Sequence, residues 1–252
     1  AEAAQAQGRG ANASGISSMA QGDGALASAQ SATAVGHVAQ ATQASATALG
    51  DDARATAVNA IAAGHASHAS GTASAAFGND AQATLADTLA LGAGSRATAA
   101  GASAVGQDAQ ASGTGALALG QGSRAGNANS VALGHNAVTA AAVATTGTTI
   151  DNVAYTYAGT APTATVSVGT ATEKRTITNV AAGRVSATST DAINGSQLFR
   201  TNQAVTSLGT NLDSLGNSTA AALGGTSAYN PTTHQVTAGL AVDGTSYTNV
   251  QD

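Results

Sequence analysis

Glycine recurs at a strict 14-residue interval through the first half of the chain. It occupies ten such positions, which are 8, 22, 36, 50, 64, 78, 92, 106, 120 and 134. Alanine stands two residues before each of these glycines, and either alanine or serine stands three residues after it. A 14-residue period is too short for a repeat built from a pair of helices, and it suits one coil of a β-solenoid.

Each repeat contains two segments with strand character. Residues 47–50 (TALG) and 117–120 (LALG) predict a short strand that ends at a glycine turn, and residues 53–55 (ARA) predict a second strand after polar turn residues. We therefore expect two short strands and two turns per coil, with parallel pairing between neighbouring coils. Ten coils at the usual strand spacing would extend about 48 Å.

The composition argues against several classes of protein. Only 2% of the 252 residues are aromatic, which is too little to fill a roughly spherical enzyme core with large side chains. The chain has a net charge of −5 and a single lysine, Lys174, which argues against a nucleic-acid partner. The absence of cysteine excludes disulfides and zinc–thiolate sites. No run approaches the roughly 18 apolar residues of a membrane-spanning helix.

Strand alternation sends the repeated alanines to one face and their neighbours to the other. If the alanines point inward, a row of larger side chains faces outward just before the repeat glycines. We call this the apolar row, and we expect packing between chains from its members Leu49, Phe77, Leu91, Val105, Leu119 and Leu133. An exposed apolar row is a liability in a soluble protein, so we expect each row to be covered by the same row of neighbouring chains. Symmetry favours a closed cyclic oligomer without fixing the number of chains.

A second column, four residues after each repeat glycine, is polar. We call its central part the polar ladder, which consists of Arg54, His68, Gln82, Arg96, Gln110 and Arg124. One interpretation is a binding ladder for an elongated anionic or glycan ligand. The simpler alternative is a solvated row whose arginines are neutralised by the nearby turn residues Asp51, Asp52, Asp80 and Asp108.

The period breaks after Gly134. The next glycine is due at position 148, where the chain has Thr, and the next match is residues 166–169 (VSVG), so 21 extra residues lie within about 139–163. This insertion carries Tyr155 and Tyr157 on one strand face. The two tyrosines could contact a ligand, or they could pack the insertion onto the roll or onto a neighbouring chain.

A heptad pattern follows the last coil. Two columns of mostly apolar residues recur every seven positions, which are Leu198, Val205, Leu212 and Thr219, and then Thr201, Leu208, Leu215 and Ala222. This predicts a short parallel coiled coil that is weak as an isolated helix, because it also contains Gly209 and Gly216. Gly224 and Gly225 should end it, and the remaining residues return to β character.

Two strings between the roll and the heptads carry a resemblance to a known family. Residues 177–185 (ITNVAAGRV) and 189–198 (STDAINGSQL), after coils ending in Ala-Leu-Gly or Ala-Val-Gly, resemble a trimeric autotransporter adhesin. The resemblance implies an all-β fold, a trimer of left-handed parallel β-rolls with 14-residue coils, which a neck joins to the coiled coil. It divides the chain into a YadA-like head (1–138), a head insert (139–165), a final coil (166–176), a neck (177–197), a short coiled coil (198–223) and a partial second β head module (224–252).

The resemblance also implies the partners and the location of the protein. It implies a homotrimer, with Val180 and Asn194 of the neck packing between chains together with Leu198, Val205, Leu208, Leu212 and Leu215 of the heptads. It further implies display on the bacterial cell surface and attachment to host cells or extracellular matrix. The membrane would be reached only through a C-terminal outer-membrane anchor that this sequence does not include, so we expect a passenger fragment.

Catalysis, metal binding and cofactors are not expected. His37, His65 and His135 share the position after a repeat glycine but lie two or more coils apart, whereas a metal site needs three or four converging ligands. Two other functions remain open beside adhesion. One is a spacer that projects a distal binding domain, and the other is an ice-binding or surface-binding solenoid. The second needs a regular threonine column, and it is disfavoured because the candidate column three residues before the repeat glycine runs Thr33, Thr47, Ile61, Ala75 and Leu89.

Overall fold

A computed structural model describes residues 2–150, 152–242 and 244–248. The chain forms two compact units, Ala1–Thr176 and Ile177–Asp252. The first unit is a β-solenoid with a hairpin near its end, and the second contains one long helix and two small hairpins. No helix among the described residues is both long enough and apolar enough to cross a membrane.

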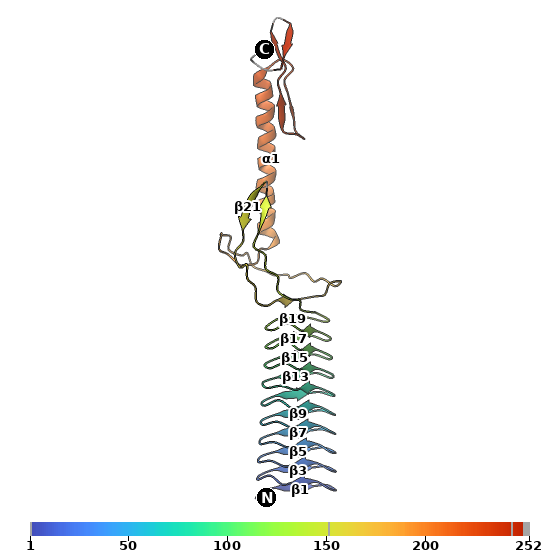
Figure 1. The fold of residues 1–252 in the computed structure, drawn as a ribbon. Coiled ribbons are helices and arrows are strands. Elements are labelled where there is room, and N and C mark those ends of the chain that lie inside the picture. Colours follow the sequence, from blue (N-terminus) through green and yellow to red (C-terminus); the bar gives the residue numbers. More distant parts are fainter. Residues whose placement is uncertain (1, 151, 243, 249–252) are drawn as a thin grey trace. The chain divides into compact units, whose positions relative to one another are not determined.

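The solenoid is built from two parallel sheets, as the repeat predicts. The first, sheet A, has eleven strands in the order β1 (Gln5–Gln7), β3 (Met19–Gln21), β5 (Thr33–Val35), β7 (Thr47–Leu49), β9 (Ile61–Ala63), β11 (Ala75–Phe77), β13 (Leu89–Leu91), β15 (Ser103–Val105), β17 (Leu117–Leu119), β19 (Val131–Leu133) and β22 (Val166–Ser167). Its strands stack one coil above the next (Figure 1).

Sheet B is the partner layer, with nine strands. They are β2 (Asn12–Ala13), β4 (Leu26–Ala27), β6 (Gln40–Ala41), β8 (Arg54–Ala55), β10 (His68–Ala69), β12 (Gln82–Ala83), β14 (Arg96–Ala97), β16 (Gln110–Ala111) and β18 (Arg124–Ala125). Except between β19 and β22, each residue pairs with the residue 14 positions along the chain in both sheets, as in Ala48↔Ala62 and Arg54↔His68. Equivalent side chains therefore form straight columns along the roll.

Alanine fills the space between the two sheets. Ala48 of sheet A and Ala55 of sheet B are fully buried, as are their equivalents in the other central coils. The position three residues after the repeat glycine is also buried, and where it is serine the hydroxyl donates to the glycine carbonyl of its own coil, at 2.9 Å for Ser67 and Gly64. This explains why the position holds alanine or serine. Both side chains are small enough for the narrow interior, and neither leaves a polar group without a hydrogen bond.

The repeat glycine is required by the backbone. Gly50 has a φ of +133°, which side-chain-bearing residues rarely adopt, and a Cβ placed on it would lie 2.7 Å from the carbonyl oxygen of Gly64 in the next coil. The turns stack too closely for any side chain at this point. Glycine is the only residue that combines this conformation with this close approach.

The insertion interrupts the roll between β19 and β22. Val131 pairs with Val166 and Ala132 pairs with Ser167, so the repeat resumes after the 35-residue offset that the sequence predicts. The intervening chain forms an antiparallel hairpin of β20 (Gly147–Ile150) and β21 (Val153–Thr156).

A cationic residue closes the far end of the roll. The Arg175 guanidinium donates a hydrogen bond to the carbonyl of His135, at 2.6 Å, and another to the carbonyl of Val168. These carbonyls belong to the last turns of the solenoid, where the next coil would otherwise supply donors. Arg175 thus caps the backbone groups that the end of a repeat leaves without a partner.

The second unit is organised around helix α1 (Gly195–Leu223). The helix begins three residues before the predicted start of the coiled coil at 198, because Asn194 and Gln197 form a capping box that satisfies its first turn. It ends at the C-cap Gly224, as predicted. Two antiparallel hairpins follow, β23 (Ala228–Asn230) with β24 (Gln235–Thr237), and β25 (Leu240–Val242) with β26 (Thr245–Tyr247).

Candidate functional site

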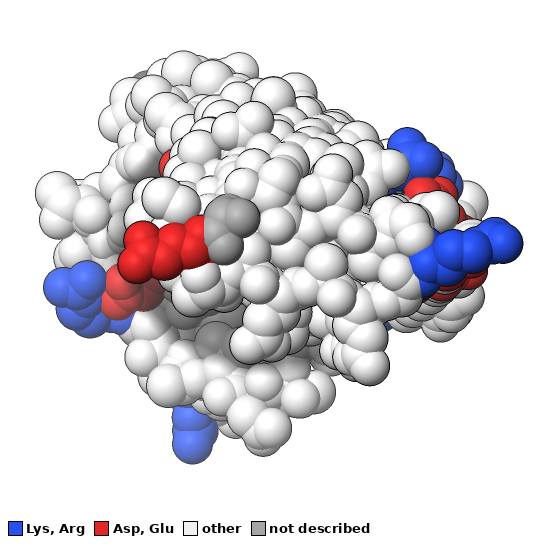
Figure 2. All heavy atoms as spheres, turned by 90° about the horizontal axis from the view of Figure 1, so that it is seen from below, with Lys and Arg blue, Asp and Glu red and all other residues white. Residues whose placement is uncertain are grey.

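The two sheets give the roll two outer faces of different chemistry. Because the alanines of both sheets point inward, the residues beside them in each strand point out on opposite sides of the roll. The outer face of sheet A carries the apolar row, and the outer face of sheet B carries the polar ladder. Charged side chains lie in a few clusters at the margins of the end-on view, with uncharged surface between them (Figure 2).

The apolar row runs along sheet A as one line. Leu91, Val105 and Leu119 pair directly from coil to coil, and the row continues to Leu133 at one end and to Phe77 at the other. Most of its side chains are exposed, at 44% for Leu91, while Val105 is half-buried. The row is broken only by Ala63, which stands between Leu49 and Phe77. A single chain therefore exposes a hydrophobic stripe that is continuous from Phe77 to Leu133.

All six residues of the polar ladder lie in one line on sheet B. Each pairs with the next through the sheet, from Arg54 and His68 to Gln110 and Arg124. The structure thus brings together the residues that the 14-residue spacing predicts to align, and their side chains are exposed or half-buried.

The arginines of the ladder differ in their ion pairs. Arg54 contacts the carboxylate of Asp52 two residues before it, with Nη2 to Oδ1 at 2.9 Å. Arg96 and Arg124 have no carboxylate oxygen within 4.0 Å among the described residues. The reason lies in the turn, because the residue two positions before these arginines is Gly94 or Gly122 where the coil of Arg54 has an aspartate. A turn aspartate therefore forms an ion pair with Arg54, whereas the described residues contain no such pair at Arg96 or Arg124.

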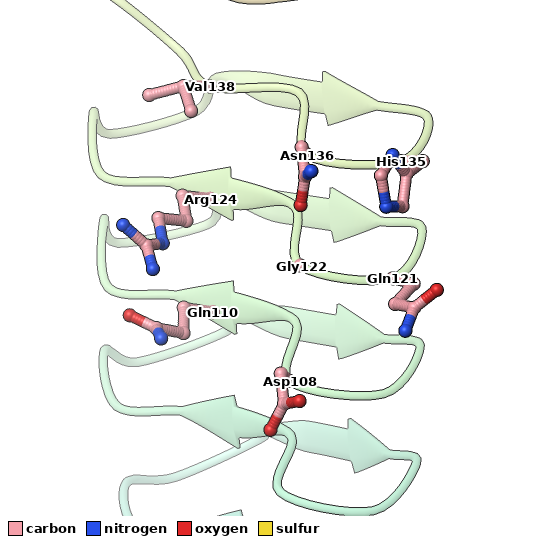
Figure 3. A pocket seen from close by; sticks show the side chains of 8 residues that line it. All are labelled: Asp108, Gln110, Gln121, Gly122, Arg124, His135, Asn136 and Val138. Carbon is pink, nitrogen blue, oxygen red and sulfur yellow. The ribbon is translucent and has the colours of Figure 1, made fainter.

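An open hollow lies beside Arg124. It has a volume of about 460 Å³, and Gln110 and Arg124 of the ladder line it together with Gly122 and Asn136 of the turn column. Figure 3 shows these columns side by side, with Gln121 and His135 on the far side of the turn. Gly122 carries no side chain, and the Asn136 side chain reaches into the space that a Cβ on Gly122 would take.

A stack of turn residues was not foreseen from the sequence. His37 Nδ1 lies 2.9 Å from Asp51 Oδ1, and His65 Nε2 lies 3.9 Å from Asp51 Oδ2. Asn79 continues the stack, with its amide nitrogen 3.2 Å from His65 Nδ1. These residues are separated by one full period, so the repeat itself could have indicated the contact. No group of three or more histidine, cysteine, aspartate or glutamate side chains suited to a metal is present among the described residues.

The tyrosines of the insertion lie apart from the ladder. Tyr155 and Tyr157 are half-exposed, and the hairpin that holds Tyr155 projects past the last coils (Figure 1). Tyr155 pairs with Thr148, and Val153 pairs with Ile150, so one hairpin face is apolar. The structure therefore does not bring the tyrosines and the arginines into one site.

The neck residues make contacts within the chain. Asn194 caps helix α1 and donates its side-chain amide to the carbonyl of Val180 at 3.1 Å. The Gln197 side chain bonds both the N–H and the carbonyl of Gly183, at 2.9 and 2.7 Å. Arg184 and Asp191 form a bidentate pair at 2.8 and 3.1 Å. The hydrogen bond from the Arg184 side chain lowers the pKa of Asp191 below its usual value.

Helix α1 presents its heptad residues on one uncovered seam. Leu198, Val205, Leu208 and Leu215 are each more than half exposed, and Leu212 is 42% exposed. The β23–β24 hairpin packs against a different part of the helix surface, where the ring of Tyr229 sits in the notch at Gly216. The hairpin thus leaves the seam free for other helices.

Tyr229 is fixed by polar contacts on the same side of the helix. Its hydroxyl is 2.7 Å from Asp213 Oδ1 and 2.7 Å from His234 Nδ1. Desolvation and the hydrogen bond to Asp213 raise the pKa of Tyr229 to about 12. The hydroxyl therefore stays protonated in the physiological range and donates to the aspartate.

Two family models match the chain. The model described as the YadA head domain repeat matches eight overlapping windows between residues 13 and 137. The model described as the coiled stalk of trimeric autotransporter adhesin matches residues 176–221. The two together cover both the roll and the seam-bearing helix.

Individual proteins show the same likeness. Autotransporter adhesin BtaE of Brucella suis biovar 1 (strain 1330) is 60% identical over 70 residues, which are 28% of this chain and 10% of BtaE. The chain therefore spans about a tenth of the length of that relative. The crystal structure of the collagen-binding domain of the Yersinia adhesin YadA is 29% identical, with a TM-score of 0.52 over 77% of this chain and 89% of that one. The C-terminal YadA-like domain of a Burkholderia pseudomallei protein is 46% identical, with a TM-score of 0.45 over 55% of this chain and 57% of that one.

Acid should weaken the neck through Asp191. Because its pKa is lower in the folded chain than in the unfolded chain, its pairing with Arg184 stabilises the fold at pH values above the usual aspartate range, and this stabilisation is lost as the pH falls through the lowered pKa. In thermal unfolding followed by the helical circular dichroism signal, Asp191→Asn should lower the melting temperature at pH 6 and reduce the further loss between pH 6 and pH 3. Parallel pH profiles for the original chain and the variant would contradict this assignment.

Proposed function

Because the chain belongs to the YadA-like trimeric autotransporter adhesins, we propose that it is a surface-exposed passenger segment that attaches bacteria to host cells, extracellular matrix or other surfaces. Its relatives support the proposal: BtaE is named an autotransporter adhesin, and the matched YadA domain is described as collagen-binding. The role is one of binding and display, on the outer surface of the bacterium, without catalysis.

The observation that carries the proposal is the division of the roll into two unlike faces. The apolar row on sheet A has the character of a surface buried between chains, since its leucines are exposed in one chain and aligned from coil to coil. The polar ladder lies on the opposite sheet, so association through the row leaves the ladder in solvent. A roll with one face for its own copies and another for outside molecules suits an adhesive head.

We further propose that the association is a parallel homotrimer. The apolar row and the helical seam of α1 are two separate hydrophobic stripes on the same chain, and the heptad spacing of the seam suits parallel helices. A closed ring of three chains would cover both stripes without leaving an end exposed.

Sedimentation equilibrium tests the trimer. The intact chain should sediment at three times its 23.7 kDa mass. Replacing Leu91 and Leu119 by serine removes roughly 1.5–3 kcal/mol of burial per side chain and should dissociate or aggregate the assembly. The matched control replaces Gln82 and Gln110 by serine on the opposite sheet and should leave the trimer intact. A monodisperse monomer for the intact chain would contradict the proposal.

Adhesion is tested with the same protein on immobilised matrix proteins, glycans and cultured cells. The trimer should bind at least one of these surfaces, and a shortened chain ending near Gly169, kept trimeric by a fused coiled coil, should keep that binding. If the shortened chain loses binding that the full chain has, the roll is not the adhesive part. If the full trimer binds none of these surfaces, the segment is a spacer instead.

A further inference from the structure

We propose that the part of the polar ladder between Arg96 and Arg124 binds an acidic polysaccharide that lies along the roll axis. This inference rests on the adhesive function proposed above, and it adds the site and the chemical class of the ligand. Each arginine would pair with one carboxylate of the polymer, and Gln110 between them would bond a neutral sugar. The following observations carry it.

The two arginines are charged groups without an ion-pair partner among the residues that the structure describes. Both are exposed, and no carboxylate oxygen lies within 4.0 Å of either among the described residues. Arg54 in the same column is held by Asp52 at 2.9 Å, so the difference is local. A guanidinium presents its donors in a planar fork that matches a carboxylate, and such bidentate pairs are among the stronger hydrogen bonds in proteins. Arg96 and Arg124 are therefore the positions on this face best prepared to hold an anion.

The spacing of the arginines selects the kind of polymer. Arg96 and Arg124 are separated by two coils, or about 9.6 Å at the usual strand spacing. One coil advances by close to the length that one pyranose ring adds to an extended β-linked polysaccharide. A polymer with an acidic sugar at every second position thus places one carboxylate on each arginine and one neutral sugar beside Gln110, whose exposed amide can bond hydroxyl groups.

An acidic peptide fits the same spacing poorly. Side chains on one face of an extended peptide recur at about 6.6 Å, and the next position near the required distance faces the opposite way. A polymer charged on every unit also fits poorly, because Asp108 lines the same hollow as Arg124 and would repel the additional charge. The aspartate can instead accept hydrogen bonds from the hydroxyl groups of a neutral sugar.

The hollow beside Arg124 gives a sugar ring room next to the cation. Its volume of about 460 Å³ arises where Gly122 takes the place that Asp108 and Asn136 hold in the neighbouring coils. Gly122 has a φ of +65°, close to the values of +55° for Asp108 and +54° for Asn136, so the backbone of this column also accepts aspartate and asparagine. Glycine at position 122 therefore supplies no carboxylate to Arg124, in contrast to Asp52 beside Arg54, and the Asn136 side chain lies where a Cβ on Gly122 would stand.

The test measures binding of unsulfated chondroitin decasaccharides, which alternate glucuronate with a neutral amino sugar, to the intact protein by isothermal titration calorimetry. Arg124→Gln and Arg96→Gln should each weaken binding about tenfold, as expected for the loss of a charged hydrogen bond. The ladder already carries glutamine at Gln82 and Gln110, so these changes suit the fold. Arg54→Gln is the matched control and should change the affinity less than twofold, because the Arg54 guanidinium is already paired with the carboxylate of Asp52.

A second pair of variants separates charge from space. Gly122→Asp displaces the Asn136 side chain from the position of the new Cβ and should place a carboxylate beside Arg124, as Asp52 is placed beside Arg54. It should weaken binding at least as much as Arg124→Gln. Gly122→Asn fills the hollow without charge and should weaken binding less. Thermal unfolding of each variant shows whether the roll is intact. A variant that has the melting temperature of the original chain and also keeps its affinity for the probe counts against the site.

The comparison ligands complete the test. A neutral chito-oligosaccharide and poly-L-glutamate should each bind at least tenfold more weakly than the chondroitin probe. Equal losses from Arg54→Gln and Arg124→Gln, or equal binding of poly-L-glutamate, would overturn the inference. If the chain adheres to cells or matrix without binding chondroitin, the inference fails and the adhesive function stands. If it binds chondroitin through these arginines but adheres to no surface, the site stands and the adhesive function fails.

Discussion

The structure depends on the close stacking of one coil on the next in a strict 14-residue register. At the repeat glycine the backbones approach so closely that a Cβ on Gly50 would lie 2.7 Å from the carbonyl oxygen of Gly64. The alanine interior follows from the same constraint, because two thin sheets can meet only across small side chains. Backbone pairing between coils thus takes over the role that large interlocking side chains have in a globular core. The ends of such a stack leave backbone groups open, and Arg175 covers them at one end.

The functional surfaces are consequences of this arrangement. A column of equivalent residues must run straight along the roll, so any chemistry placed in one column becomes a continuous stripe. Leucine, valine and phenylalanine before the repeat glycines form a hydrophobic stripe, and the residues of the ladder form a polar stripe on the other sheet. Local differences then arise from single positions in the turns. Aspartate at position 52 forms an ion pair with Arg54, whereas glycine at position 122 supplies no carboxylate to Arg124, which lies beside an open hollow.

The repeat made much of the roll predictable. The strands, the buried alanines, the exposed row and the resumption of the coil at Val166 follow from the period alone, because register is the same in every coil. The ionic state of the ladder was harder to predict, since it depends on the residue two positions before each arginine. The contact of Tyr229 with Gly216 and Asp213 could not be predicted, because it depends on how a separate hairpin packs on the helix. The predicted start of the helix was three residues too late, because the heptads indicate only which residues form the seam. The capping box of Asn194 and Gln197 sets where the helix begins.

The most direct test of the coil register is the thermal stability of two deletion variants. Removal of residues 65–78 takes out one full 14-residue period, and removal of residues 65–77 takes out one residue fewer. The first deletion should keep a single cooperative transition near that of the original chain, because every remaining residue still meets its equivalent in the next coil. The second should lower the transition strongly or split it, since a one-residue slip turns the alanines at the junction outward. Equal melting of the two variants would contradict the claim that the 14-residue register holds the roll together.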